Sequence, residues 1–193
     1  LDLSDLDFGG ANLAGTNLLA ANLTGANLSG TRLVGANLDR AVIIRANFAG
    51  ADLSRASLFA PVAYSRFEAA RAEAPNFTGA DLSHTRLVVR FGKTNLSGAD
   101  FSNARLEWQR RDQLKTPIRT EIAWSDLSGA NFAGANLERV SLTSSNLRDA
   151  NFSGANLTRA DLSYSDLTGA DLTQARLDGA ILEGVKGLAA LQP

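Results

Sequence analysis

The sequence predicts an all-β solenoid, a rod of stacked coils in which the chain turns once every five residues. Three observations carry this prediction. Apolar residues recur at every fifth position in two long runs. A small residue precedes nearly every apolar centre by two positions, and the residue between the two is usually polar. A period of five matches neither the 3.6-residue turn of an α-helix nor the two-residue alternation of a flat strand.

The first run contains eleven apolar centres, from Phe8 to Leu58, and the second contains twelve, from Leu127 to Leu182. A helix would rotate such a residue by about 140° per repeat, so that no single face would be buried. We therefore expect each pentapeptide to form a short extended piece and a corner. The large and small residues lie two apart, so both point inward, and the asparagine or aspartate between them points outward. The two residues after each centre are mostly small or charged and predict an exposed turn.

These repeats, such as ANLTG and ANLSG over 21–30, resemble the pentapeptide-repeat family, whose motif is roughly A-[DN]-L-x-x. The resemblance covers about 1–58, 76–106 and 125–183. It implies a right-handed quadrilateral parallel β-helix, with one repeat on each side and twenty residues in each coil. Residues twenty apart then stack, so that Phe132 lies over Phe152. The outer residues Asn131, Asn151 and Asp171 form a column for the same reason.

We expect a single solenoid domain over 1–193, divided where the period breaks. Its expected parts are regular coils over 1–58, 76–106 and 122–182, an irregular coil over 59–75, a loop excursion over 107–121 and a C-terminal cap over 183–193.

The first break lies in the irregular coil. Phe67 is the next apolar centre there after Leu58, and the period resumes weakly with Ala72. A second slip is a step of four residues, from Leu87 to Phe91. Such departures are more informative about function than the repeats, because the repeats form the scaffold.

The excursion over 107–121 is the best candidate for an interaction site. Its first residues favour a helix, which Pro117 would end. Tryptophan and arginine are enriched at the energetic centres of protein interfaces. The alternative is that Trp108 folds back and covers a coil. The candidate interface residues are Trp108, Arg110, Arg111, Leu114, Lys115, Ile118 and Arg119.

The last residues suggest a short helical turn across the final coil. Val185, Leu188 and Leu191 follow one another at a spacing of three. A cap of this kind covers the exposed leucines and the open backbone edge at the end of a solenoid. Leu188 and Leu191 either cap the rod or join two copies of the chain into a homodimer. A homodimer can also form through an end of the rod.

Composition excludes the chemistry that depends on cysteine or on several histidines. The chain has no cysteine and one histidine, His84, which lies in a predicted turn. Disulfides, thiolate metal sites and multi-histidine sites are therefore excluded. The regularly spaced aspartates of one coil, Asp161, Asp166 and Asp171, would lie on three different sides and diverge. We expect no catalytic residue, no cofactor and no metal site.

Charge and hydropathy limit the classes of partner that we expect. Nineteen basic and twenty acidic residues give a net charge of −1, and no run of about 18 apolar residues occurs. We expect a protein partner, no direct nucleic-acid binding and no membrane insertion. The sequence begins with Leu1 rather than methionine, which suggests a trimmed or processed chain. The family resemblance suggests the bacterial cytoplasm as a first location.

Two functions remain open. The first is a non-catalytic scaffold that binds proteins through its outer faces and excursions. The second follows from the resemblance, because quinolone-resistance members of the family mimic DNA and occupy the DNA channel of type II topoisomerases such as gyrase. The near-neutral charge disfavours this second function, since arginines such as Arg40, Arg139 and Arg159 would interrupt an acidic track.

Overall fold

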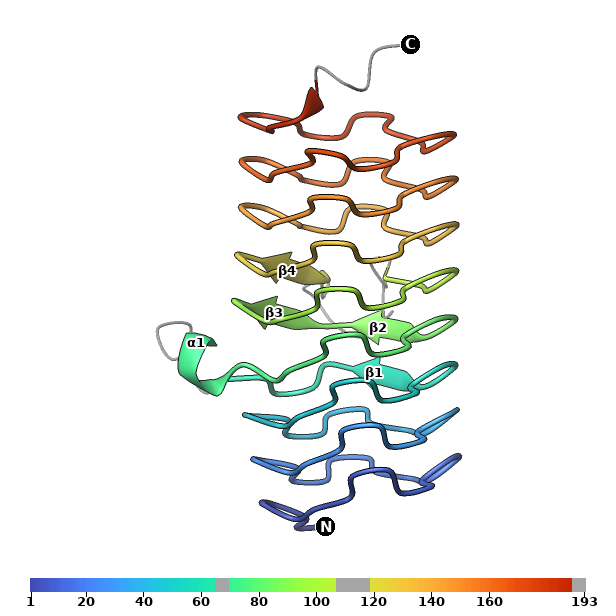
Figure 1. Ribbon diagram of the computed structural model, residues 1–193, viewed down its shortest axis with the longest axis vertical. Helices are drawn as coiled ribbons and strands as arrows, with labels where there is room; N and C mark the ends of the chain where they lie inside the picture. The colour runs from blue at the N-terminus through green and yellow to red at the C-terminus, as the bar shows by residue number, and fades with distance from the viewer. Residues whose placement is uncertain (65–69, 107–118, 189–193) are drawn as a thin grey trace, which may run out of the picture.

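The computed structural model describes residues 1–64, 70–106 and 119–188, with side chains except at 70 and 71. The described chain winds into a tall rod of stacked coils (Figure 1), and the fold is the right-handed quadrilateral β-helix expected from the repeats. Leu1 and the last described residues lie at opposite ends of the rod.

Each pentapeptide joins the coil before it to the coil after it. The N–H of Asn27 donates to the carbonyl of Leu6, and the N–H of Leu28 donates to the carbonyl of Asn47, at 2.9 and 2.7 Å. A tight turn closes each repeat, as when the N–H of Ala26 donates to the carbonyl of Leu23 at 3.0 Å. The backbone is therefore satisfied mainly by neighbouring coils rather than within one segment.

Four columns of outward residues define the four sides of the rod. Side 1 carries Asp2, Asn22, Val42, Val62, Arg90, Glu121, Ser141, Asp161 and Ile181. Side 2 carries Asp7, Asn27, Asn47, Asn76, Asn95, Asp126, Asn146, Asp166 and Lys186. Side 3 carries Asn12, Arg32, Asp52, Asp81, Asp100, Asn131, Asn151 and Asp171. Side 4 carries Asn17, Asn37, Ser57, Arg86, Arg105, Asn136, Asn156 and Arg176.

The interior is a continuous apolar core. The centres from Leu23 to Leu58 and from Phe77 to Leu106 are at most 1% exposed, as are those from Ile122 to Leu167. The expected column is confirmed, because Phe132 stacks on Phe152 and Asn131 pairs with Asn151, which pairs with Asp171. Burial of this kind contributes about 1.5–3 kcal/mol for each large apolar side chain.

Two pairs of short parallel strands lie in the middle of the rod (Figure 1). Strand β1 (Ser57–Phe59) pairs with β2 (Arg86–Val88), and β3 (Arg90–Gly92) pairs with β4 (Glu121–Ala123). The step of four from Leu87 to Phe91 is present, and Val88 and Val89 between them are both buried. One turn residue is missing at this corner, which lets β2 continue almost directly into β3.

The coil over 59–75 differs from the sequence prediction. Ala63, not Phe67, follows Leu58 as the next inward residue, because Val62 pairs with Val42 and Ala63 is only 3% exposed. The pattern concealed this centre because alanine is small. Phe67 lies outside the described residues.

Ala72 was also wrongly predicted as a weak centre. It is exposed and belongs to α1 (Ala70–Glu73), which projects from one corner of the rod and lies against β3 (Figure 1). Pro75 restores the period by taking the buried small position before Asn76 and Phe77.

At the other end, the coil continues beyond the position where the sequence suggested a cap. Lys186 pairs with Asp166, and its N–H donates to the carbonyl of Ser165 at 2.9 Å. Leu188 packs against the core while remaining partly exposed. Leu191 lies outside the described residues. The part of the chain that is described contains no helix with the length and hydrophobicity needed to span a membrane.

Candidate interaction surface

Leucine and phenylalanine side chains fill the interior of this rod. A ligand or a partner can therefore contact only its outer surface. Within residues 1–64, 70–106 and 119–188, no three acidic, histidine or cysteine side chains gather into a possible metal site. His84 is exposed in a turn, at a φ of 55°. Asp161, Asp166 and Asp171 lie on sides 1, 2 and 3 and diverge, as predicted.

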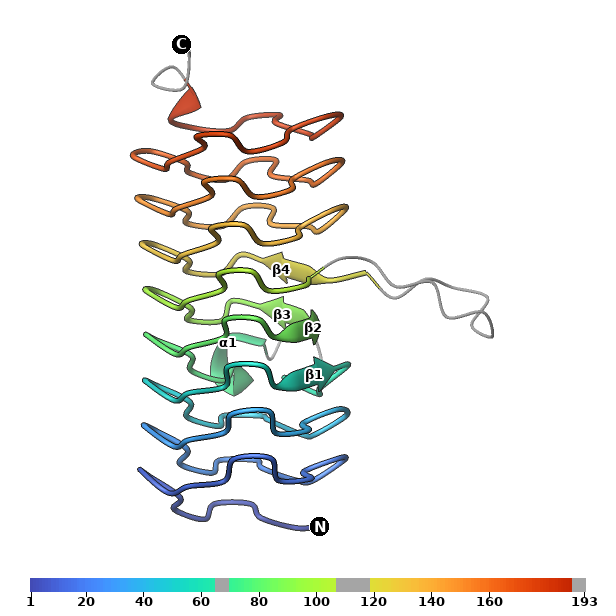
Figure 2. The ribbon, with the colours of Figure 1, turned by 90° about the vertical axis from the view of Figure 1, so that its right-hand side faces the viewer.

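Most of the predicted interface lies outside the described residues. This applies to Trp108, Arg110, Arg111, Leu114, Lys115 and Ile118. Arg119 is described and exposed. It is followed by Thr120, which is buried and whose hydroxyl donates to the carbonyl of Leu87 at 3.3 Å. Thr120 therefore fixes the point at which the chain re-enters the rod before β4 (Figure 2).

Side 4 collects arginines from distant parts of the sequence. Arg86 and Arg105 are exposed and occupy the same ladder position in adjacent coils. The corner after side 4 adds Arg40, Arg139 and Arg159, with φ values of 57°, 59° and 57°. We call side 4 together with this corner the arginine side. Positive φ is unfavourable for a residue with a side chain, so these arginines are not there to stabilise their turns.

The charges on the arginine side do not cancel. Its described residues include six arginines, which are Arg40, Arg86, Arg105, Arg139, Arg159 and Arg176. They include three carboxylates, which are Asp39, Glu138 and Asp178. Two ion pairs are formed, Arg139 with Glu138 at 3.7 Å and Arg176 with Asp178 at 3.5 Å. Exposed pairs of this kind contribute little to stability.

The opposite side has the opposite balance. Side 2 and the corner after it carry Asp7, Asp126, Asp149 and Asp166 against Arg148 and Lys186. Counting charge along segments of the sequence conceals this separation, because each side takes one residue from every coil. The ladder register, which determines which residues share a side, reveals the separation of charge. The breaks in the five-residue period shift this register. Arg86 and Arg105 are nineteen residues apart rather than twenty, because of the step of four at Leu87.

A ladder of asparagine side chains joins consecutive coils along side 2. The amide of Asn76 donates to Oδ1 of Asn47, and the amide of Asn47 donates to Oδ1 of Asn27, at 3.1 and 3.2 Å. The same Oδ1 of Asn47 accepts the N–H of Ala49 at 3.2 Å. These outward residues thus hold turns and join coils, in the outward position that the sequence pattern predicted.

A family model described as pentapeptide repeats matches the chain in eight copies, over residues 2–40, 21–58, 123–159 and 155–186. These matches span more than half of the chain. A search of curated proteins finds no relative that matches it.

Several solved structures are similar. HetL, a pentapeptide repeat protein involved in heterocyst differentiation regulation in the cyanobacterium Nostoc sp. strain PCC 7120, is 28% identical over 96% of this chain and 86% of its own, with a TM-score of 0.35. A trypsin-treated variant of QnrB1, a plasmid-mediated fluoroquinolone resistance protein, is 20% identical over 96% and 86%, with a TM-score of 0.50. A pentapeptide repeat protein of the Arabidopsis thaliana thylakoid lumen is 22% identical over 81% and 68%, with a TM-score of 0.14.

Proposed function

Because this chain belongs to the pentapeptide-repeat family, we propose that it is a non-catalytic scaffold that binds a protein partner through the outside of its rod. The proposed contact surface is the arginine side, and the partner presents an acidic surface. The observation that carries this proposal is the stack formed by Arg86 and Arg105 together with the turn arginines beside it.

The geometry suits protein docking. Arg40, Arg105 and Arg159 are exposed and make no ion pair with the described residues. Arginine is the basic residue that binds carboxylates best, because its planar guanidinium donates two parallel hydrogen bonds. Complementary charge of this kind raises the association rate and the specificity of a protein complex. The segment predicted as an interface follows this same corner in the sequence, since Leu106 is the last described residue before it and Arg119 is the first described residue after it.

The test compares two double variants of equal charge change. Arg105→Glu with Arg159→Glu reverses the net charge of the arginine side, and Arg32→Glu with Arg55→Glu makes the same change in charge on side 3, which is already acidic. Each pair contains one ladder residue and one turn residue with positive φ, since Arg159 and Arg55 have φ values of 57° and 60°. The bait is the whole chain, and the captured proteins are quantified by mass spectrometry from a lysate of the source cells.

We expect the first double variant to lose a defined set of captured proteins by roughly tenfold or more per reversed contact pair, and the second to keep it. Equal capture by both variants contradicts the proposed surface. Deletion of 109–118 is the companion experiment. Loss of the same proteins assigns part of the interface to the loop, and unchanged capture removes the loop from it.

The second candidate, a DNA mimic that protects gyrase, is favoured by one observation. Asp52, Asp81 and Asp100 are stacked in consecutive coils on side 3 and form the longest acidic column among the described residues. Arg55 flanks this column at the next corner, and Arg32 precedes it on the same side. We expect no inhibition of purified gyrase in a supercoiling assay and no protection from a quinolone. Inhibition that disappears in Asp81→Asn with Asp100→Asn supports the DNA mimic instead.

A further inference from the structure

The exposed apolar side chains of this rod gather on one face. Beyond the first coil, the large apolar side chains that are exposed among the described residues are Val62, Trp124, Tyr164 and Ile181, at 42, 57, 61 and 49%. Val62 and Ile181 belong to the ladder of side 1, and Trp124 and Tyr164 occupy the same position in the turn that follows side 1. We call side 1 together with this corner the aromatic side. Apolar residues gathered in this way are typical of an interaction surface.

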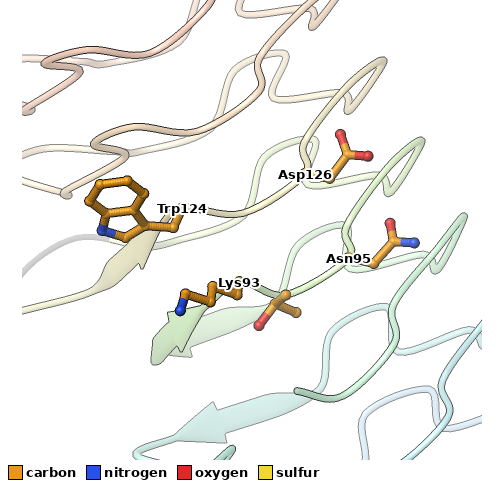
Figure 3. Close-up of a pocket in the computed structure, with 5 residues that line it drawn as sticks. Lys93, Asn95, Trp124 and Asp126 are labelled. Atoms are coloured by element: carbon orange, nitrogen blue, oxygen red, sulfur yellow. The ribbon is translucent and has the colours of Figure 1, made fainter. Parts of the chain in front are cut away.

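A groove lies in the middle of the aromatic side. It has a volume of about 430 Å³ and is lined by Lys93, Thr94, Asn95, Trp124 and Asp126. Figure 3 shows Lys93 and Trp124 on the corner turns of consecutive coils. The two turns are joined directly, because the N–H of Lys93 donates to the carbonyl of Ala123 at 3.1 Å. The surface therefore offers an indole ring and an ammonium group side by side.

The charges of the aromatic side are separated along the rod. We number the coils by the ladder of side 1, from Asp2 in coil 1 to Ile181 in coil 9. Outside the insertion that contains α1, the charged residues described on this surface in coils 3–5 are all basic, namely Arg45, Arg90 and Lys93. Those described in coils 6–9 are all acidic, namely Glu121, Asp161 and Glu183. One half of the surface thus attracts the other.

A surface with this distribution of charge is complementary to a second copy of itself. A twofold axis that crosses the face at right angles to the rod reverses the order of the coils in the second copy, and it keeps ladder opposite ladder and corner opposite corner. The basic coils of each copy then face the acidic coils of the other. A twofold axis parallel to the rod brings coils of the same number together instead, and with them like charges.

We propose that the aromatic side joins two copies of this chain into an antiparallel homodimer, with the twofold axis between coils 6 and 7. Coil 5 of one copy then faces coil 8 of the other, and coil 4 faces coil 9. Arg90 comes opposite Asp161 of the second copy, and Val62 comes opposite Ile181 of the second copy. Each contact occurs twice, because the interface is symmetric.

The central charges select this register. An axis on coil 6 sets Glu121 opposite Glu121 of the second copy, and an axis on coil 7 sets it opposite Asp161. Like charges across an interface disfavour both arrangements. With the axis between the two coils, Glu121 faces the uncharged Ser141, and the ammonium of Lys93 faces the ring of Tyr164. A cation near an aromatic face is attracted by it.

Tyr164 is held in place before a second copy binds. Its hydroxyl donates to Oε1 of Glu183 at 2.5 Å. Its ring lies against Gly184 in the next coil, where an added Cβ would be 2.5 Å from the ring carbon Cδ1. The glycine thus leaves the space that the ring occupies. An aromatic side chain fixed in this way loses little conformational entropy on association.

The homodimer and the partner proposed for the arginine side use different surfaces. Side 4 adjoins side 1 and does not face the second copy, so Arg86 and Arg105 stay exposed in the dimer. The inference therefore goes beyond the proposed function. In the antiparallel arrangement α1, which leaves the rod after side 1 of coil 4 (Figure 1), lies beside coils 8 and 9 of the second copy.

The test exchanges charges between two copies of the whole chain. Arg90→Glu sets an acidic residue opposite Asp161 twice in each dimer, and Asp161→Arg sets a basic residue opposite Arg90 twice. Analytical ultracentrifugation measures the mass, and we expect the parent to dimerise with a Kd on the order of 10 µM. Each variant alone should dimerise more weakly by roughly tenfold or more. An equimolar mixture of the two should form a heterodimer as readily as the parent, because it restores both contacts between opposite charges.

A second exchange tests the apolar contact independently. Val62→Glu and Ile181→Arg should each weaken the dimer, and their mixture should restore it. Arg45→Glu is the matched control, since coil 3 lies beyond the last coil of the second copy, and it should dimerise as the parent does. The proposal is overturned if the parent is monomeric at about 100 µM, if Arg90→Glu dimerises as the parent does, if neither mixture forms a heterodimer, or if Arg45→Glu loses the dimer.

Discussion

The rings of Phe132 and Phe152 lie face to face in adjacent coils, with centroids 4.9 Å apart and planes within 2° of parallel. Phe101 continues the stack on the other side of Phe132, at 4.8 Å and 7°. Isolated aromatic pairs prefer offset or edge-to-face contacts. The parallel arrangement here follows from the spacing of the coils, which is close to the 4.7–4.9 Å between neighbouring strands of a sheet.

The middle ring of this stack should contribute most to stability. Phe132→Ala is expected to lower the free energy of unfolding by about 3–5 kcal/mol, because it leaves a large cavity in a fully buried position. Phe152→Ala removes the same atoms but one ring contact fewer, so its cost should be lower by about 0.5–1.5 kcal/mol. Urea denaturation followed by circular dichroism measures both values. Equal costs would show that the ring contacts add nothing beyond burial.

Positive φ at the corners predicts opposite effects for two neighbouring turn residues. Gly35 and Arg55 occupy the same corner in adjacent coils, with φ values of 65° and 60°. Gly35→Ala should destabilise the chain by about 1 kcal/mol, although the added methyl meets no atom within 4 Å, because L-residues disfavour this conformation. Arg55→Gly should stabilise it by a similar amount. Thermal melts of the two variants check the signs, and a loss in both would contradict the backbone argument.

The asparagine ladder predicts a graded series at Asn47. Asn47→Ala removes the bonds to Asn27, Asn76 and the N–H of Ala49, and should cost about 1–2 kcal/mol. Asn47→Asp keeps an acceptor for Ala49 and Asn76 but loses the donor to Asn27, so its cost should be intermediate at neutral pH. Chemical denaturation of both variants gives the order, and an aspartate variant less stable than the alanine variant would contradict it.

Acid should weaken the rod partly through Asp166. Hydrogen bonds from the hydroxyl and N–H of Thr168 hold the pKa of Asp166 below its usual 3.8, with a smaller contribution from Arg148. Since the folded pKa is the lower one, this stabilisation is complete above pH 3.8 and is lost as the pH falls through the folded value.

We therefore expect the difference in melting temperature between the parent and Asp166→Asn to shrink from pH 6 to pH 2.5. The asparagine keeps an acceptor for Thr168 and does not titrate, while all other carboxylates titrate equally in both proteins. Circular dichroism melts at the two pH values measure the difference. A difference that stays constant would mean that Asp166 does not contribute to the acid sensitivity.

Much of this fold could be predicted from the sequence. The five-residue period established which side chains face inward, from Leu23 to Leu167, because the solenoid depends on one local rule repeated in every coil. The stacking of Phe132 on Phe152 followed directly from counting twenty residues. Counting failed at Ala63, since a small inward residue leaves no apolar signal, and at Ala72, which the sequence placed in the coil and the structure places in α1.

The sequence by itself thus determined the coil, its core and the outward position of its asparagines, since each of these depends on neighbours within five residues or at a fixed distance of twenty. Only the tertiary structure decided which charges share a side and which buried hydroxyl lacks a partner. Both depend on how the insertions and the missing turn residue shift the register. They brought Arg86 beside Arg105 in adjacent coils, and they left Oγ1 of Thr94 buried without a hydrogen-bond partner among the described residues.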